Sequence, residues 1–282
     1  MAFGDFNRIN TNVASLESQF SLNKINKNLS ETQLRLSTGK RINKAEDDAA
    51  GFSIAAKLSS RIAGLEQALN NTGDAKSVLD IAESSFNSIL DILNTLKTKA
   101  TQAANDTYGA DERGFIQGQV DSLTSELDAL VGQTVYQGNA LLDGNYNATF
   151  QVGERIADTI NVLIQSSGTT DAFDANGLGV DALSVTSHAS AQAAMTSVDA
   201  AITQVASTVN DLGIYQTQLS IREEILTQAV NSNSAARSRI EDADFAKEQS
   251  EAIKLQILQQ TAIAALTQAN SAPQAVLGFV GQ

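Results

Sequence analysis

The stretch LDIAESSFNSILDILNTLKTKATQA, residues 79–103, decides the fold of this chain. Its apolar residues recur at alternating steps of three and four, which places their side chains along one stripe of an α-helix. These residues are Leu79, Ala82, Phe86, Ile89, Leu93, Leu96, Ala100 and Ala103. Such a stripe is typical of a helix that packs lengthwise against another helix. A similar stripe starts at Ile54, and turn-forming residues follow at 105–109, so the sequence predicts a long helix over 46–105.

Both ends of the chain carry stripes of the same kind. The first stripe shifts by two residues partway: it runs through Ile9, Val13, Leu16 and Phe20, then through Leu22, Ile25, Leu29 and Leu36. We expect Asn10 or Thr11 to cap this helix and Gly39 to end it near Thr38. The last helix, 243–269, is apolar on nearly every face, with Ile253, Ile257, Leu258 and Leu266. Such a helix must be buried on most of its faces.

The middle of the chain contains two further helical patterns and one β pattern. Apolar residues from Ile116 to Leu130 predict a third helix that stops at Gly132, and residues 198–226 predict a fourth, with Gln216 and Glu223 in a half-polar seam. Alternating β-branched and aromatic residues predict a β-hairpin near 148–165. We expect a loop over 168–179 and a solvated Ser/Thr-rich surface over 184–197. The fold class is therefore mainly α: a long antiparallel helical or coiled-coil bundle with a small β-hairpin and paired terminal helices.

Composition argues against most kinds of chemistry. The chain has 282 residues, with 19 Lys and Arg against 32 Asp and Glu, so its net charge of −13 argues against nucleic-acid binding. It has no Cys and a single His, His188, which we expect to be solvated. Residues 171–183 resemble a calcium loop only weakly, because Leu183 stands where a bidentate Glu belongs. Asp47 and Asp48 suit a helix start better than an acid/base pair. We predict no catalytic residue, no metal and no cofactor.

No stretch has the roughly 18 consecutive apolar residues of a membrane span, and residues 1–12 do not look like a cleavable signal peptide. A cytoplasmic protein and one exported unfolded by a dedicated machine would both fit this pattern. The helical stripes also fit two interpretations: an ordinary intramolecular bundle, or self-assembly in which other copies cover the apolar terminal helices.

The two ends of the chain contain motifs that resemble a known family. They are INTN at 9–12, RLSTGKRIN at 35–43, DDAAG at 47–51, AARSRIEDADFA at 235–246 and ILQQ at 257–260. Residues 268–277 extend the C-terminal motifs, and the inner segments at 132–138 and 150–153 resemble segments of the same family. Together they resemble bacterial flagellin over essentially the whole chain, without a large insert between residues 167 and 183.

The resemblance implies a structural subunit that self-assembles into the flagellar filament as a helical homopolymer, and not an enzyme. It implies three parts: an N-terminal helix segment (1–43), a helical rod with the β-hairpin (44–242) and a C-terminal helix (243–282) that pairs with the first. The apolar residues of the two terminal helices quoted above would form the assembly contacts. It further implies secretion to the extracellular filament, with an export apparatus, an export chaperone on the C-terminal helix, and cap and junction proteins as partners.

Flagellins that the vertebrate Toll-like receptor senses typically carry an Arg and a Leu on the second helix and a Glu on the third. Here those positions correspond to Thr95, Lys99 and Gln119, which predicts weak receptor activation. Two alternatives remain open at the level of sequence. One is a hook–filament junction protein, which shares the terminal pattern. The other is a secreted membrane-active helical effector, although the last helix lacks the basic face and Trp anchors of interfacial helices.

Overall fold

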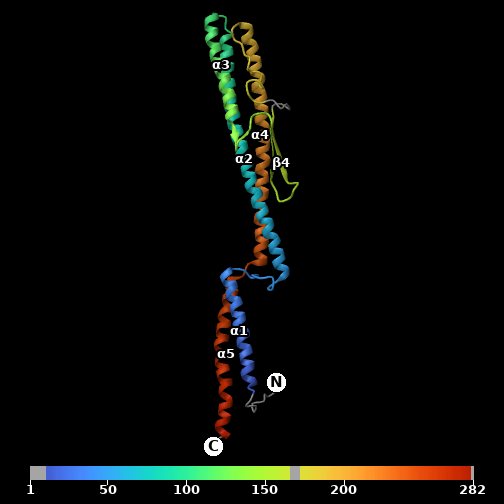
Figure 1. Ribbon diagram of the computed structural model, residues 1–282, viewed down its shortest axis with the longest axis vertical. Helices are drawn as coiled ribbons and strands as arrows, with labels where there is room; N and C mark the ends of the chain where they lie inside the picture. Colours follow the sequence, from blue (N-terminus) through green and yellow to red (C-terminus); the bar gives the residue numbers. More distant parts are fainter. Residues whose placement is uncertain (1–10, 166–171, 281–282) are drawn as a thin grey trace. The chain divides into compact units, whose positions relative to one another are not determined.

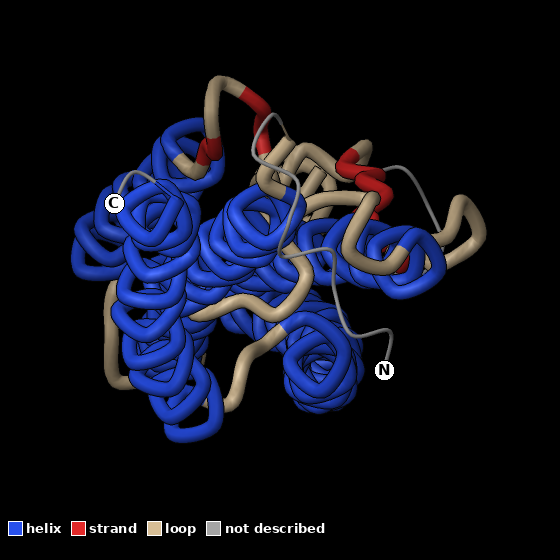
Figure 2. The backbone as a smooth tube through the Cα atoms, turned by 90° about the horizontal axis from the view of Figure 1, so that it is seen from below, coloured by secondary structure: helices blue, strands red, loops and turns tan. Residues whose placement is uncertain are grey.

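The computed structural model describes residues 11–165 and 172–280. This part of the chain is mostly helix, as Figures 1 and 2 show. The helices are α1 (Val13–Thr38), α2 (Ala49–Ala103), α3 (Ala110–Gln133), α4 (His188–Glu241) and α5 (Phe245–Val280). The strands are β1 (Val135–Tyr136), β2 (Asn139–Ala140), β3 (Tyr146–Gln151) and β4 (Thr159–Ile164). The predicted fold class is confirmed.

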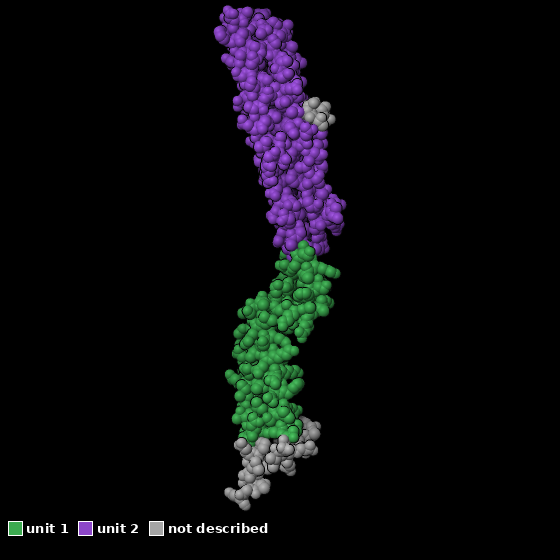
Figure 3. Space-filling view, in the orientation of Figure 1, with its two compact units in different colours: residues 1–60, 232–282 green, residues 61–231 purple. Residues whose placement is uncertain are grey.

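The chain divides into two compact units, which Figure 3 colours separately. Unit 1 combines residues 1–60 with residues 232–282, and unit 2 is residues 61–231. Unit 1 contains α1 and α5 together with the first residues of α2 and the last residues of α4. Unit 2 contains the rest of α2 and α4, all of α3 and both sheets.

The core of unit 2 is built on the stripe that begins at Leu79. All eight stripe residues from Leu79 to Ala103 are at most 1% exposed. They pack against Val120 and Leu127 of α3 and against Val198 and Leu212 of α4. Phe86 meets the ring of Phe173, from the loop before α4, edge to face at a centroid distance of 4.7 Å. The stripe is therefore covered on several sides by other parts of unit 2.

A polar seam runs beside this core and fixes α2 and α4 as antiparallel neighbours. Lys76 Nζ lies 2.8 Å from Glu223 Oε2. Farther along, Lys97 Nζ lies 2.6 Å from Asp199 Oδ1. The half-polar line predicted on α4 contacts α2 in this seam, because the Gln216 amide donates a hydrogen bond to Glu83 Oε2 at 2.6 Å. Charged and amide groups in the seam thus stay hydrogen-bonded while the apolar line of α4 remains buried.

The predicted β-hairpin is confirmed as the antiparallel pair β3–β4, in which Tyr146 faces Ile164 and Gln151 faces Thr159. Val162 and Ile164 are fully buried in the core of unit 2. A second, shorter hairpin, β1–β2, was not predicted. It turns at Gln137 and Gly138, which both have positive φ.

Several helix boundaries differ from the sequence prediction. Helix α5, predicted over 243–269, covers Phe245–Val280. Helix α2 covers Ala49–Ala103 within the predicted 46–105. Helix α4 begins at His188, ten residues before the predicted pattern. Part of the Ser/Thr-rich stretch expected on the surface is consequently helical, with Ala191 and Ala194 buried. Of the loop expected over 168–179, residues 168–171 lie outside the described residues, and 172–179 form turns.

Replacing Phe86 with Ala should lower the free energy of unfolding of unit 2 by about 3–5 kcal/mol, because a fully buried aromatic side chain leaves a cavity. Denaturant titration followed by circular dichroism measures the change. The matched control is Phe115→Ala on α3, where the ring is 75% exposed and the expected change is within about 0.5 kcal/mol. Equal losses in the two variants would contradict the placement of this core.

Candidate functional site: the paired terminal helices

Helix α1 starts with a cap that also ties it to α5. Asn12 Oδ1 accepts a hydrogen bond from the backbone N–H of Ser15 at 3.0 Å, so Asn12 is the N-cap. The prediction of Asn10 or Thr11 as the cap is wrong. The Asn12 amide has a second partner, because its Nδ2 donates to the Ala269 carbonyl at 2.7 Å. This contact across the helix pair explains why Asn12 takes the cap position.

At its other end α1 stops as predicted, with Thr38 as the last residue and Gly39 in the left-handed conformation (φ 69°). The chain then runs beside the segment between α4 and α5. Lys40 and Asp242 form an isolated β-bridge, and the Arg41 N–H donates to the Glu241 carbonyl at 2.6 Å. The end of α1 and the start of α5 are therefore held together by backbone hydrogen bonds.

Polar contacts along the pair show that α1 and α5 are antiparallel. Gln259 Nε2 donates to Asn26 Oδ1 at 2.7 Å near the middle. Arg35 Nη1 lies 3.7 Å from Glu248 Oε1 near the Gly39 end. Sequence reasoning missed these contacts. The spacing of residues within each helix gives no signal for them, because it does not say which residue of one helix lies opposite which residue of the other.

The inner face of the pair contains the second half of the α1 stripe. Leu29 is buried, and Leu22, Ile25 and Leu36 are half-buried. From α5, Ala252 and Leu255 are buried and Leu266 is half-buried. These side chains therefore stabilise the pair within one chain.

The outer face of α1 contains the first half of the stripe. Val13 is 52% exposed, Leu16 57% and Phe20 70%. Each residue turns an α-helix by about 100°, so the two-residue shift between Phe20 and Leu22 rotates the stripe by about 200°. Val13, Leu16 and Phe20 therefore face away from α5. Ile9, which belongs to the same half, lies outside the described residues.

Helix α5 also has an outer apolar face. Ile253 and Ile257 are 49% and 59% exposed. By the same helical geometry they lie about 150° from the side that contacts α1. Leu258, 41% exposed, borders this face. The pair consequently presents two apolar surfaces, one on the outside of each helix, which no described residue of the chain covers.

The turn between α1 and α2 is fixed by two carboxylates. The backbone N–H groups of Asn43 and Lys44 donate to Asp47 Oδ2 at 2.9 Å each and hold the pKa of that carboxyl below its ordinary value. Asp48 Oδ1 accepts from the Gly51 N–H at 2.9 Å, as a cap for α2 does. Asp48 therefore has the expected role at the start of α2, whereas Asp47 holds the turn that precedes it.

The remaining sites that were considered have structural explanations. His188 is exposed at the first residue of α4, and its Nδ1 lies 2.6 Å from the Ala104 carbonyl, near the end of α2. In the weak calcium motif, Asp174 Oδ1 accepts from the Gly177 N–H, while Asp171 lies outside the described residues. Within the described ranges no group of three or more potential ligands could hold a metal ion. None of the helices in those ranges has the length and apolar character needed to cross a membrane.

The three positions aligned with the receptor-sensed pattern lie on unit 2. Thr95 is exposed on α2, and its hydroxyl donates to the Asp91 carbonyl at 2.9 Å. Lys99 is half-buried on the same helix, and Gln119 is exposed on α3. None of the three belongs to the core, so their identities are free to change without loss of the fold.

Comparison with known proteins gives matches at both ends and over the whole length. Residues 9–147 match the family described as bacterial flagellin N-terminal helical region, and residues 195–280 match the bacterial flagellin C-terminal helical region. The chain is 36% identical to a flagellin of Bacillus subtilis, over 96% of this chain and 98% of that one. It is 34% identical to a flagellin of Listeria innocua, over 95% and 97%.

A solved structure from Vibrio parahaemolyticus, assigned as a flagellar hook-associated protein, aligns with a TM-score of 0.59. The alignment covers 70% of this chain and all of that one, at 13% sequence identity. At this identity the likeness shows a common fold and carries no information about function.

Replacing Asp47 with Asn should loosen the turn between α1 and α2 at neutral pH. Because the folded-state pKa of Asp47 is lowered, its contribution to stability is present above the ordinary value of 3.8 and is lost as the pH falls through the folded-state value. We expect faster amide hydrogen exchange at Asn43 and Lys44 in the variant at pH 7. After correction for intrinsic rates, that difference should shrink toward low pH. Glu46→Gln is the control, and a similar loss of protection there would count against the assignment.

Proposed function

This chain belongs to the bacterial flagellin family and is a structural subunit of the extracellular flagellar filament, and we propose that its paired terminal helices are the main assembly surface. The observation that carries the proposal is the exposed apolar face on the outside of each helix. Val13, Leu16 and Phe20 form one of these faces, and Ile253 and Ile257 belong to the other. Removing these side chains from water is the driving force for contact between copies.

The position of the two faces indicates the kind of assembly. They lie on different helices of the pair and point in different directions, so the outside of α1 in one copy meets the outside of α5 in the next. A contact between two different surfaces is heterologous, and it generates an open helical array when the rotation does not close. This geometry is what a filament subunit requires.

We also propose the division into an N-terminal helix segment (1–43), a rod (44–242) and a C-terminal helix (243–282). In the free subunit the terminal segments bury little apolar surface, while ordering each backbone residue costs about 1–2 kcal/mol. Contact with neighbouring copies supplies the missing burial. The rod instead contains the large core around Phe86 and Leu93.

The remaining partners follow from membership of the family. We propose export of the unfolded chain through the flagellar export apparatus. A chaperone would bind the C-terminal helix before export, and cap and junction proteins would contact the subunit at the filament ends. Flagellins are structural proteins, and we propose no catalytic activity for this chain.

Two alternatives are less well supported. A hook–filament junction protein would share the terminal helices, but the flagellins of Bacillus subtilis and Listeria innocua match the chain over nearly their full lengths. A membrane-active effector would need a face suited to lipid. The outer face of α5 instead mixes Ile253 and Ile257 with Gln260 and Ala264. The basic residue beside it, Lys254, lies 3.3 Å from Glu251, and the chain has no Trp to act as an anchor.

The joint substitution of Leu16 and Phe20 by Asp tests the assembly surface. We expect the monomer to keep its helix content, because both side chains are already exposed. The critical concentration for seeded polymerisation should rise about a hundredfold or more, since burial of each large apolar side chain contributes about 1.5–3 kcal/mol. Sedimentation of filaments at a series of protein concentrations measures this quantity.

The control is Gln33→Asp, which adds a charge at another exposed position of α1 and should leave the critical concentration nearly unchanged. Deletion of residues 1–30 or of residues 255–282 should abolish filament growth while residues 46–240 stay helical. Normal filaments from the double Asp variant or from either truncated chain would refute the proposed surface.

We further propose that the chain activates the vertebrate Toll-like receptor weakly, because Thr95, Lys99 and Gln119 depart from the sensed pattern. The triple variant Thr95→Arg, Lys99→Leu, Gln119→Glu should signal more strongly than the unsubstituted monomer in a reporter-cell assay. Picomolar potency of the unsubstituted monomer would contradict the proposal.

A further inference from the structure

The loop before α4 contains a chemically reactive pair of residues. Asn176-Gly177, within the weak calcium motif, is the one place in the sequence where Gly follows Asn. The side chain of Asn176 is exposed. In such a pair the backbone nitrogen of the second residue can attack the side-chain carbonyl carbon of the first. Gly at the second position favours the attack, because it has no side chain to shield the nitrogen.

The fold requires glycine at position 177. A Cβ atom there would collide with the backbone carbonyl oxygen of Ala172. The backbone has little freedom to move aside, because Phe173, next to Ala172, is fully buried against the ring of Phe86. The residue that makes Asn176 reactive is therefore also the residue that lets this loop pack.

In the folded loop a carboxylate holds the attacking nitrogen. The Gly177 N–H donates to Asp174 Oδ1 at 2.8 Å. The backbone carbonyl of Asn176 is also bonded, since it accepts from the Gly179 N–H at 3.0 Å. For the attack, the Gly177 nitrogen must lose its proton and turn toward the Asn176 side chain, so its bond to Asp174 must break first. A hydrogen bond to a charged carboxylate is stronger than one between neutral groups.

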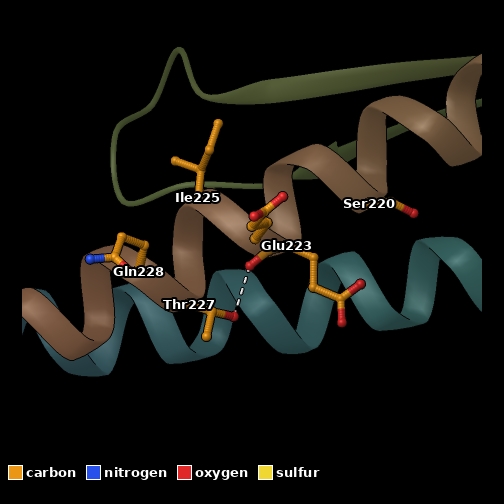
Figure 4. Close-up of a pocket in the computed structure, with 6 residues that line it drawn as sticks. Ser220, Glu223, Ile225, Thr227 and Gln228 are labelled. Carbon is orange, nitrogen blue, oxygen red and sulfur yellow. Dashed lines mark hydrogen bonds between the residues drawn. The ribbon is translucent and has the colours of Figure 1, made fainter.

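Amide side chains on the helices lie in a less reactive setting. Gln228 of α4 lines the open hollow shown in Figure 4, but the backbone around it is helical. A helix bonds each N–H to the carbonyl four residues earlier, and this keeps the nitrogen from the preceding side chain. The side chain of Gln is also one methylene longer, so the ring that would form is larger. Asn176, by contrast, is exposed, lies outside the helices and precedes Gly.

We propose that Asn176 is a site of spontaneous chemical modification, and that the hydrogen bond from Gly177 to Asp174 restrains the reaction in the folded chain. In the reaction the Gly177 nitrogen forms a bond to Asn176 Cγ, and the side-chain nitrogen leaves as ammonia. The proton that Gly177 loses is carried by solvent to the departing nitrogen. Water then opens the five-membered ring at either carbonyl, which leaves an aspartate or its isomer linked through the side-chain carbonyl.

Both products disturb the loop that contains them. Each places a new carboxylate two residues from that of Asp174, and like charges at short range repel. The isomer also adds one atom to the backbone before Gly177, where the Ala172 carbonyl leaves no room. The modified loop therefore supports Phe173 less well in its contact with Phe86. This proposal concerns the chain itself and does not depend on the filament function.

Peptide mapping by mass spectrometry tests the site in the full chain. The wild type is kept in mildly alkaline buffer with and without denaturant, and the conversion of Asn176 to the two acids is followed over time. Asn145, an exposed residue followed by Tyr146, is the slower internal standard. We expect ready conversion in denaturant and slow conversion in the folded chain. Folded Asp174→Ala should convert at least about tenfold faster than the folded wild type, because the bond to a charged group is lost.

The matched control is Asp128→Ala. Asp128 Oδ1 accepts from the Ala175 N–H at 2.8 Å, so this change removes the other carboxylate that holds the loop and leaves the bond from Gly177 to Asp174 in place. Its rate should stay close to that of the wild type, and circular dichroism checks that both variants keep their helices. Conversion of Asn176 no faster than that of Asn145 in denaturant would overturn the site. Equal rates in the two variants would overturn the role of Asp174.

Discussion

Two helices packed side by side bury only one stripe of each, and this limit governs the terminal part of the chain. In the α1–α5 pair the shared stripe is well filled around Leu29 and Leu255. Phe20 and Ile257 lie on the outer faces, and no further packing within the pair can cover them. The sequence nevertheless keeps these positions apolar. The terminal helices therefore contain more apolar surface than the pair itself buries, and this excess is the basis for proposing that copies in a filament cover it.

In unit 2, further elements cover the helix faces that a simple pair of helices would leave exposed. Helices α2 and α4 are covered by α3, by the β3–β4 hairpin and by the loop that contains Phe173. The apolar stripe of α2 is therefore buried from Leu79 to Ala103. Polar groups in the seam are satisfied within the unit, as with Lys76 and Glu223. Among the described residues no buried side-chain nitrogen or oxygen lacks a hydrogen-bond partner. Unit 2 therefore buries its apolar stripe with its own contacts, whereas the outer faces of α1 and α5 stay exposed.

Periodicity predicted the parts of the fold that rest on repeated apolar steps. The stripe from Leu79 to Ala103, the stop at Gly39 and the β3–β4 hairpin all follow from local spacing. The start of α4 did not, because Ala191 and Ala194 are small and give no apolar signal among Ser and Thr. The cap of α1 was also missed. Several neighbouring residues there can cap a helix, and the hydrogen bond from Asn12 to Ala269, 257 positions away, decides between them.

Only part of the candidate site could be predicted from the sequence, because its exposed faces depend on how the two terminal helices pack. The two-residue shift between Phe20 and Leu22 is plain, but its meaning depends on where α5 lies. Once α5 is known to pack on the side of Leu22, the shift separates residues that hold the pair together from residues on its exposed outer face.

A filament needs contact energy between its copies and a defined alignment of one copy on the next. Apolar stripes such as Val13 to Phe20 supply contact energy, but a stripe that repeats every three or four residues also permits neighbouring alignments. With a net charge of −13 the copies also repel one another, and salt screens that repulsion beyond about 8–10 Å. Only short-range contacts can then choose among alignments.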